Sequence, residues 1–429
     1  MKVIGIGAAG NKAVLNAVQL KAIEAKDCLM MNSTTKDFPK ENEVVDALGN
    51  NIHIECALIS SIGGCGKERE IGKDIMREYL SNRNVVAKLK DFVTENEDHV
   101  VIVTSIAGGT GSGGANLLGK FIHTDLFQEE GLVMDITIIG FRGFNEDLRE
   151  RENTLNFLKE IDPEFTVQLI DNSSFMKSCD GNKVIAEKNA NINFAIRLSL
   201  MAGRKIAPSS QNIDATDLYK LVTTPGYQQI EYAQLDTIKN KEAFQKAIKD
   251  MIDNSNGIET VPSCACFGIM LNVNPDTLNY FDFDYTYLKS VYGQTIETYI
   301  HIQYCDDVTD KYEWMAIIVS GLDLPVKYLQ AVYQQYLQMD NEITTNKSKN
   351  EDFFAALGEI KTNAITPSMN RGRNRKGVGR RGSVVSKVLQ EANELPKPTQ
   401  PITNGNITMN KPNMNEVLQD DTPTVKNTF

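Results

Sequence analysis

The stretch Ala107–Gly113, AGGTGSG, comes one residue after the apolar run Val100–Ser105 and opens a segment rich in Ala, Leu and Gly. This order predicts a glycine-rich turn between a buried strand and a helix. Free N–H groups at a helix start, with two hydroxyl groups nearby, favour an anion such as a di- or triphosphate. A flexible linker is the alternative, but linkers do not lie between a buried strand and a helix. The predicted phosphate-binding residues of this loop are Gly108, Gly109, Thr110, Gly111, Ser112 and Gly113.

Two further glycine-rich turns also follow strand-like runs. Gly5–Gly10, GIGAAG, matches the dinucleotide fingerprint G-x-G-x-x-G, and Gly63–Lys67, GGCGK, resembles part of a P-loop. The P-loop match is incomplete, because Glu68 stands where Ser or Thr would bind magnesium. An NAD-dependent oxidoreductase would need a carboxylate at the end of the second strand, which is MNST at 31–34. Three phosphate-type loops instead favour a nucleotide with several phosphates.

Strand-like and helix-like segments alternate through the first half of the chain. The strand-like runs are Lys2–Ile6, Cys28–Met31, His53–Leu58, Val100–Ser105, Asp135–Phe141 and Phe165–Ile170. Helical periodicity marks Asn11–Ala25, Lys67–Phe92, Glu146–Ile161 and the long segment Val184–Met201. This alternation predicts a parallel sheet with helices on both faces, in which ligands bind beyond the carboxyl ends of the strands.

The second half predicts a smaller α/β domain. Strands are expected in Ser263–Leu271, Thr298–Tyr304 and Glu313–Ser320, and an amphipathic helix starts at Pro325, with a weaker helical pattern at Asp352–Ile365. The predicted fold class is α/β: a Rossmann-like parallel-sheet domain joined by a long central helix to a smaller α/β domain, then C-terminal helices and a disordered tail. The corresponding segments are 1–205, 206–324, 325–365 and 366–429.

Composition narrows the class of protein. The 429 residues hold no run of eighteen apolar residues, so we expect no membrane span and no membrane partner. The first residues, MKVIGIGAAGN, do not have the layout of a signal peptide. Seven scattered cysteines without a CxxC pair, and only four histidines, disfavour a disulfide scaffold and a zinc site. A reducing, cytoplasmic setting is expected.

Charge is distributed unevenly. The segment 366–429 carries ten Lys and Arg against five Asp and Glu, a balance of +5, so the overall charge of −11 leaves −16 on residues 1–365. Six cations fall within Arg371–Arg381, and no aromatic residue precedes Phe429 in this segment. A polar stretch of this kind cannot offset its ordering entropy by burial, which predicts disorder. A basic tail on an acidic body predicts a partner that is acidic, such as nucleic acid phosphates.

Three motifs carry a family resemblance. GIGAAGN at Gly5–Asn11, AGGTGSG at Ala107–Gly113 and NIDATD at Asn212–Asp217 occur in the order and context of the tubulin/FtsZ superfamily, which the chain resembles over roughly residues 1–340. GCGKERE at Gly64–Glu70 and the basic tail look more like the TubZ group of plasmid and phage tubulins. The resemblance implies a GTPase that forms filaments, with GTP or GDP and Mg²⁺ as cofactors.

The resemblance also implies roles for single residues, with the ligands of Mg²⁺ left unassigned. The loop that lines the α- and β-phosphates matches Gly7, Ala8, Ala9, Gly10 and Asn11. The loop that meets the γ-phosphate matches Gly64, Cys65, Gly66 and Lys67, where Lys67 replaces a small or apolar residue of FtsZ. The remaining nucleotide-binding positions are Asn32, then Glu146 and Arg151 at the ribose (with Asp147 and Glu150 as alternatives), and Asn172 and Asn193 at the base. An amide offers a donor and an acceptor together, which suits the edge of guanine.

The acidic loop implies the mechanism. In the superfamily, the loop matched by Asn212, Asp214 and Asp217 reaches the nucleotide of the next subunit, where two carboxylates can polarise and orient a water. The resemblance therefore implies hydrolysis coupled to head-to-tail contact, and a contact that does not close makes filaments. A capping or solvated turn is the alternative role for these two aspartates.

In TubZ-type systems the tail binds a DNA-bound adaptor, which here would fall on 366–429, with Ser383–Glu394 folding as a short helix on the partner. Direct binding of DNA is a second possibility. The implied function is the movement of plasmid or phage DNA by a GTP-dependent filament. The alternatives are a phage tubulin that positions replicating DNA or capsids, a filament-binding protein with an inactive site, and the oxidoreductase above.

Overall fold

The computed structural model describes residues 1–40, 44–45, 51–60, 63–94, 99–144, 146–203, 213–235, 240–253, 264–281, 291, 296–304 and 312–356, the last ten as backbone only. The tail 366–429, predicted to be disordered, and Asn212 lie outside these residues. Six strands of the first half are β1 (Lys2–Ile6), β2 (Cys28–Asn32), β3 (Glu55–Leu58), β4 (His99–Ser105), β5 (Asp135–Arg142) and β6 (Thr166–Asp171). They agree with the predicted runs to within one or two residues.

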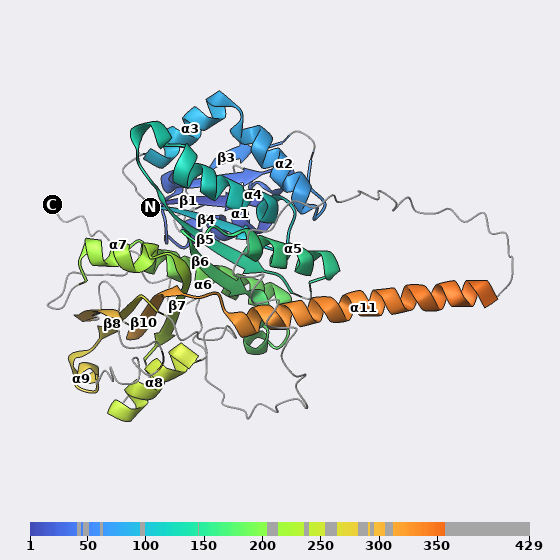
Figure 1. Cartoon of the computed structure of the whole chain (residues 1–429). Coiled ribbons are helices and arrows are strands. Elements are labelled where there is room, and N and C mark those ends of the chain that lie inside the picture. Colours follow the sequence, from blue (N-terminus) through green and yellow to red (C-terminus); the bar gives the residue numbers. More distant parts are fainter. Residues whose placement is uncertain are drawn as a thin grey trace.

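Helices cover both faces of these strands (Figure 1). On one side lie α1 (Gly7–Gln19) and α6 (Lys183–Met201), and on the other α2 (Arg69–Leu80), α3 (Arg83–Thr94), α4 (Thr110–Lys120) and α5 (Leu148–Glu160). Neighbouring residues of β4 pack on opposite faces of the sheet. Ile102 lies in the hydrophobic core with α2 to α5, and Val103 lies in the core with α1 and α6. The strands are apolar throughout because both faces are buried.

Two predicted helices end earlier than their periodicity suggests. The pattern over 67–92 forms two helices, because α2 ends at Leu80 and the side chain of Asn82 accepts a hydrogen bond from the N–H of Asn84 at the start of α3. The pattern over 11–25 stops at Gln19, because Lys21 adopts a left-handed conformation with φ 58°. A side-chain cap and a left-handed residue both end helical hydrogen bonding locally.

The second half adds antiparallel pairing to the sheet. Its elements are α7 (Ala215–Thr223), β7 (Gly226–Gln234), α8 (Lys241–Asp253), β8 (Cys266–Val273), α9 (Pro275–Leu278), β9 (Glu297–Tyr304) and β10 (Trp314–Leu322). Strand β7 pairs with β6 in parallel through Thr166 and Val167, and β10 is antiparallel to both β7 and β8. The described strands form one sheet of order β3-β2-β1-β4-β5-β6-β7-β10-β8-β9, so the predicted α/β class is confirmed.

The last described element is α11 (Val326–Ala356), which runs out of the body as one long helix (Figure 1). It includes the first five residues of the weaker pattern expected at 352–365, whose remainder lies outside the described residues. Short helical turns lie at Ala25–Asp27, Thr35–Asp37, Phe121–Asp125, Gln128–Glu130, Asn172–Phe175 and Lys177–Cys179.

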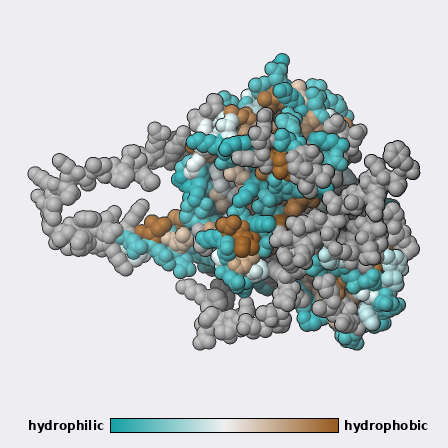
Figure 2. Space-filling model, turned by 180° about the vertical axis from the view of Figure 1, so that it is seen from behind, coloured by the Kyte–Doolittle hydropathy of each residue, from teal (hydrophilic) through white to brown (hydrophobic). Residues whose placement is uncertain are grey.

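Apolar side chains on the surface are dispersed. The face seen in Figure 2 carries separate small hydrophobic patches within a mainly hydrophilic surface. In the part of the chain that the structure describes, no helix combines the length and the apolar character needed to cross a membrane.

Candidate functional site

A cavity of about 340 Å³ lies where β1, β2 and β4 end. Because parallel strands place their carboxyl ends at one edge, the loops that follow these three strands meet there. The lining residues are Ile6, Gly7, Ala8, Ala9, Asn32, Ser33, Thr34, Asp37, Gly64, Cys65, Ser105, Gly108, Gly109, Thr110 and Gly111. The cavity therefore unites residues from all three predicted phosphate loops.

Two helices begin at this cavity. Neither α1 nor α4 has a side-chain N-cap, and neither carries an acidic residue in its first turn. Their first N–H groups thus lack a capping side chain, and both helix ends place partial positive charge at the cavity. This combination suits the phosphates of a nucleotide.

The loop 107–113 contacts two other segments that line the cavity. The hydroxyl of Thr110 lies 2.9 Å from the hydroxyl of Ser33 and donates to the Sγ atom of Cys65 at 3.2 Å. Gly10 has a packing role, because a Cβ atom there would lie 2.2 Å from the carbonyl oxygen of Val103 in β4. Gly10 thus lets α1 approach the sheet closely. Neither Gly10 nor the neighbouring Asn11 lines the cavity.

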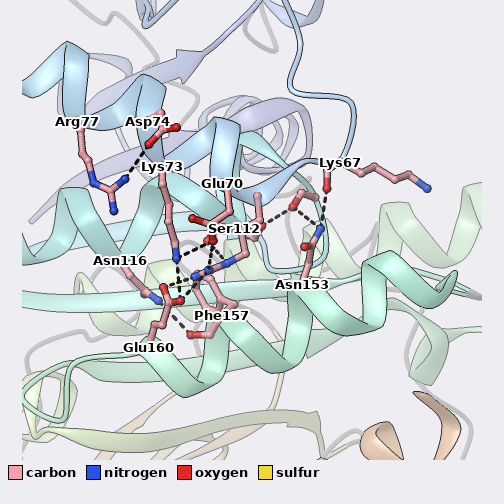
Figure 3. Close-up of polar contacts among 12 residues, drawn as sticks. Lys67, Glu70, Lys73, Asp74, Arg77, Ser112, Asn116, Asn153, Phe157 and Glu160 are labelled. Carbon is pink, nitrogen blue, oxygen red and sulfur yellow. Dashed lines mark hydrogen bonds and ion pairs between the residues drawn. The ribbon is translucent and has the colours of Figure 1, made fainter. Parts of the chain in front are cut away.

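Lys67 faces away from the phosphate loops. Its ammonium pairs with Asp147 at 2.9 Å and with Glu150 at 2.8 Å, near the start of α5. Hydrogen bonds to Glu150 and then Asp147 raise the pKa of Lys67. Figure 3 shows the side chain pointing away from Ser112 and Asn153. The cavity is not lined by four predicted residues that lie within two positions of a lining residue: Gly66, Lys67, Ser112 and Gly113.

The two residues predicted at the ribose form internal contacts in this structure. Glu146 is buried and accepts from Arg142 Nε at 2.8 Å. Burial raises the pKa of Glu146, and the charge of Arg142 opposes that shift. Arg151 donates to the carbonyl of Glu146, to Met339 and to Gln335, which connects α5 with α11. Neither residue lines the cavity.

The two asparagines predicted to bind the base differ in the hydrogen bonding of their amide oxygens. Asn172 follows β6, and its Oδ1 atom is buried without a hydrogen-bond partner. Asn193 in α6 is buried, and its Oδ1 atom accepts from Arg197 Nε at 2.8 Å. The Oδ1 atom of Asn11 is also buried and without a partner. Buried polar atoms are normally paired, so the unpaired Oδ1 atoms of Asn11 and Asn172 are exceptions. Asn11, Asn172 and Asn193 do not line the cavity.

The acidic residues Asp214 and Asp217 lie at the opposite edge of the sheet. They begin α7, in which Tyr219 donates to Asp135 at 2.6 Å and packs its ring against His99 at a centroid distance of 6.4 Å. Asp135 and His99 are the first residues of β5 and β4, whereas the cavity lies beyond the last residue of β4. Seven strand residues span about 20 Å. The structure therefore does not bring these carboxylates to the cavity of their own chain.

Five lining residues were not among the predicted site residues: Ile6 and Ser105, which end β1 and β4, and three residues after β2. Ser33, Thr34 and Asp37 follow β2 directly, next to the predicted Asn32, and Asn32 donates to Asp37 at 2.9 Å. The sequence does contain a signal for these residues, because a cluster of polar residues follows the buried strand β2. Within the described ranges, no three His, Cys, Asp or Glu side chains group as a metal site.

Comparisons with known proteins show what the chain is similar to. Residues 1–180 match the model described as Tubulin/FtsZ family, GTPase domain. The tubulin-like protein CetZ3 of Haloferax volcanii is 22% identical over 290 residues, which are 62% of this chain and 70% of that protein.

Solved structures share the fold at low identity. The GTPγS-form protofilament of TubZ from Bacillus thuringiensis serovar israelensis gives a TM-score of 0.62 at 16% identity, covering 82% of this chain and 94% of that chain. The GTPγS-bound protofilament of CetZ2 from Haloferax volcanii gives 0.59 at 18% identity, covering 81% and 100%. The two groups are similarly close, so these likenesses do not single out the TubZ group. Residues 1–180 thus resemble the GTPase domain of the tubulin/FtsZ family, and the solved structures share the fold.

Proposed function

We propose that the protein binds and hydrolyses GTP, assembles head to tail into filaments, and completes each nucleotide site with Asp214 and Asp217 of the next copy. One observation carries this proposal: the phosphate-type cavity and the two carboxylates lie at opposite edges of the same parallel sheet. Copies stacked along the strand direction would bring one chain's carboxylates to its neighbour's cavity.

Phosphate binding is supported by the two helix starts that line the cavity without acidic residues in their first turns. Magnesium, when bound with the nucleotide, would offset phosphate charge, with the phosphate oxygens supplying much of its coordination. Among the lining residues Asp37 offers the carboxylate that suits such an ion.

Guanine recognition is assigned to Asn172, whose buried Oδ1 atom has no hydrogen-bond partner in the chain. Guanine presents N1–H and N2–H₂ donors on its edge, which an amide oxygen can accept, whereas adenine has no donor at these two positions. An acceptor in this place therefore favours GTP over ATP. The amide group of Asn193 would supply a donor to the O6 atom of guanine.

Head-to-tail assembly is supported by exposed apolar residues at both edges. Val184 and Ile185, at the start of α6 on the cavity side, are 78% and 47% exposed. Leu132 and Val133, just before β5 on the other side, are 56% and 63% exposed. Burying such side chains stabilises a contact. The two neighbours described above, TubZ and CetZ2, were solved as protofilaments.

For hydrolysis, Asp214 and Asp217 of the neighbouring copy would orient a water toward the terminal phosphate and accept its proton. The TubZ-like role, in which the basic tail at 366–429 links the filament to plasmid or phage DNA through an adaptor, rests on sequence resemblance. A phage tubulin that positions replicating DNA or capsids is the alternative.

Nucleotide selectivity and concentration dependence test the proposal together. Purified protein should bind GTPγS and GDP but not NAD, and ATP should compete poorly. GTP hydrolysis per chain should rise with protein concentration, because the complete site forms only at a contact. Equal competition by ATP would contradict the guanine assignment. Hydrolysis at the full rate per chain below the assembly threshold would contradict hydrolysis at a contact.

A further inference from the structure

One buried amide lies behind two of the phosphate-type loops. Asn153 in α5 is 6% exposed, and its Nδ2 atom donates to the carbonyl oxygen of Lys67 at 3.0 Å, of Ala107 at 3.0 Å and of Gly108 at 3.1 Å. Lys67 belongs to the loop 63–67, and Ala107 and Gly108 open the loop 107–113. Figure 3 shows this amide between the two loops.

These hydrogen bonds fix the direction of the loop's N–H groups. A trans peptide group holds its C=O and its N–H on opposite sides. With the carbonyls of Ala107 and Gly108 turned toward Asn153, the N–H groups of Gly108 and Gly109 point away from α5. Both glycines line the cavity, and Asn153 does not. The amide of Asn153 therefore selects the peptide orientation in which the loop offers donors to a phosphate.

The loop 63–67 is held against α5 by further contacts. Lys67 pairs with Asp147 and Glu150, and the next residue, Glu68, pairs with Arg149. The two loops also touch directly, because a Cβ atom on Gly109 would lie 2.8 Å from the Cβ of Cys65. A shift of the loop 63–67 away from α5 would therefore disturb the loop 107–113 as well.

We propose that Asn153 is a positioning residue for the third phosphate: it fixes the loops 63–67 and 107–113 in one relative arrangement, and so favours GTP over GDP. This inference rests on the proposed function, because it takes the loop 63–67 as the one that meets the third phosphate. The start of α1, which Asn153 does not contact, remains able to hold the first two phosphates of either nucleotide.

The test compares two asparagines of similar burial. Asn153→Leu keeps a branched side chain with four heavy atoms but removes the donor from three carbonyl groups. Asn116→Leu is the matched control. Asn116 in α4 is 8% exposed, and its side chain donates to the carbonyl of Phe157 in α5 at 3.1 Å and not to a carbonyl of either loop. Affinities for GTPγS and for GDP are measured by calorimetry, and thermal unfolding is measured for both variants. Asn153→Ala serves if the leucine variant does not fold.

We expect Asn153→Leu to lower the affinity for GTPγS by about tenfold, equivalent to about 1.4 kcal/mol, and the affinity for GDP by about threefold or less. Asn116→Leu should lower the unfolding temperature and leave the ratio of the two affinities unchanged. An unchanged ratio in the Asn153 variants, or an equal change in the Asn116 variant, would overturn the positioning role. Wild-type protein that binds neither nucleotide would overturn the proposed function, and this inference with it.

Discussion

Asp214 has a structural role of its own. Its carboxylate accepts from the N–H of Asp217 at 2.8 Å and so caps the start of α7. The capping alternative is therefore correct as a local description, and the catalytic role stays a proposal. Replacing a capping Asp by Ala costs about 1 kcal/mol of stability, whereas Asn caps as well as Asp does. Asp214→Asn consequently separates the carboxylate's chemistry from its cap.

His99 predicts a pH dependence of stability. Burial, followed by the charge of the N-terminus, lowers the pKa of His99 to about 3. The unfolded chain takes up this proton below about pH 6.5. The stability contribution of neutral His99 is therefore fully present above pH 6.5 and is lost as the pH falls toward 3.

Urea unfolding at pH 6.5 and 5.0 checks this dependence. His99→Gln keeps a partner for Thr137, which now lies 2.8 Å from His99 Nε2, and removes the titration. Wild type should lose roughly 1–2 kcal/mol more than the variant over this range. His123 is present in both the wild type and the His99→Gln variant, so its titration does not affect the difference between their free energies of unfolding. Equal losses in the two chains would show that His99 is not the group responsible.

Positions at the cavity were predictable where a motif marks them. The loop 107–113 and Cys65 stand out in the sequence. Cys65 and four residues of that loop line the cavity: Gly108, Gly109, Thr110 and Gly111. Asn153 carries no such signal, because its role depends on carbonyl groups 45 to 86 residues away. The roles predicted for Glu146, Arg151 and Asn193 stay predictions.

At the scale of elements, buried strands were the most predictable. Strands β1, β4 and β5 are short apolar runs buried on both faces, which gives a strong signal. Strand β7, GYQQIEYAQ, escaped prediction because its centre is polar. Its buried Gln228 finds partners in the carbonyl of Leu221 at 3.1 Å and in Ser320 at 2.8 Å, which only the tertiary structure supplies.

The contact of α2 with α5 gives a prediction about helices. Arg69, buried at the start of α2, donates to both oxygens of Glu160 at the end of α5, at 2.9 and 2.6 Å. Lys73 adds a third bond to Glu160 at 2.8 Å, and Figure 3 shows these two side chains facing each other. Glu160→Gln should lower the free energy of unfolding by about 1–2 kcal/mol at pH 7, because the buried Arg69 loses its charged partner.

Acid should remove this difference. Burial opposes ionisation of Glu160, but the bonds from Arg69 and Lys73 outweigh it and lower its pKa. Its contribution is thus complete above about pH 4.5 and is lost as the pH falls through the lowered pKa. Asp74→Asn is the control, since the pair Arg77–Asp74 is more than half exposed on both sides and should contribute little. A Glu160→Gln chain as stable as wild type at pH 7 would contradict this account.

At the scale of the whole molecule, one sheet connects both halves of the chain. Strand β7 continues the parallel strands, so the second half extends the sheet that positions the cavity. The boundaries 1–205 and 206–324 stay predictions. Charge and composition predicted an acidic body and a basic tail. The opposite placement of the cavity and the two carboxylates follows from the direction of α6. This helix starts after the carboxyl end of β6 and leads the chain back to the edge of the sheet where the parallel strands begin.

Truncation tests the role assigned to the tail. A chain that ends at Ile365 lacks the basic segment but keeps every cavity residue, Asp214 and Asp217. It should hydrolyse GTP and form filaments at the wild-type rate, while its binding to DNA or to a DNA-bound adaptor is lost at physiological salt. Electron microscopy and a co-sedimentation assay read the two properties. Loss of assembly would make the tail structural, and DNA or adaptor binding that survives truncation would contradict the tether.

The central claim is that two chains share each active site, and mixing two defective chains tests it. Asp214→Asn keeps its cap and its cavity but should bind GTP without hydrolysing it, giving filaments that do not turn over. Gly109→Val disables the cavity, because a side chain there meets Cys65, yet it leaves Asp214 and Asp217 intact. The Gly109→Val chain is suitable only if it enters mixed filaments. Fluorescent labels on both chains show whether the two variants occur in the same filament.

The measurement is phosphate release per chain in mixed filaments of these two variants. Each variant alone should be nearly inactive. A mixture should recover part of the wild-type rate, because an Asp214→Asn cavity can meet the intact carboxylates of a Gly109→Val neighbour. Mixed filaments that release phosphate no faster than the two variants measured separately would contradict catalysis between chains.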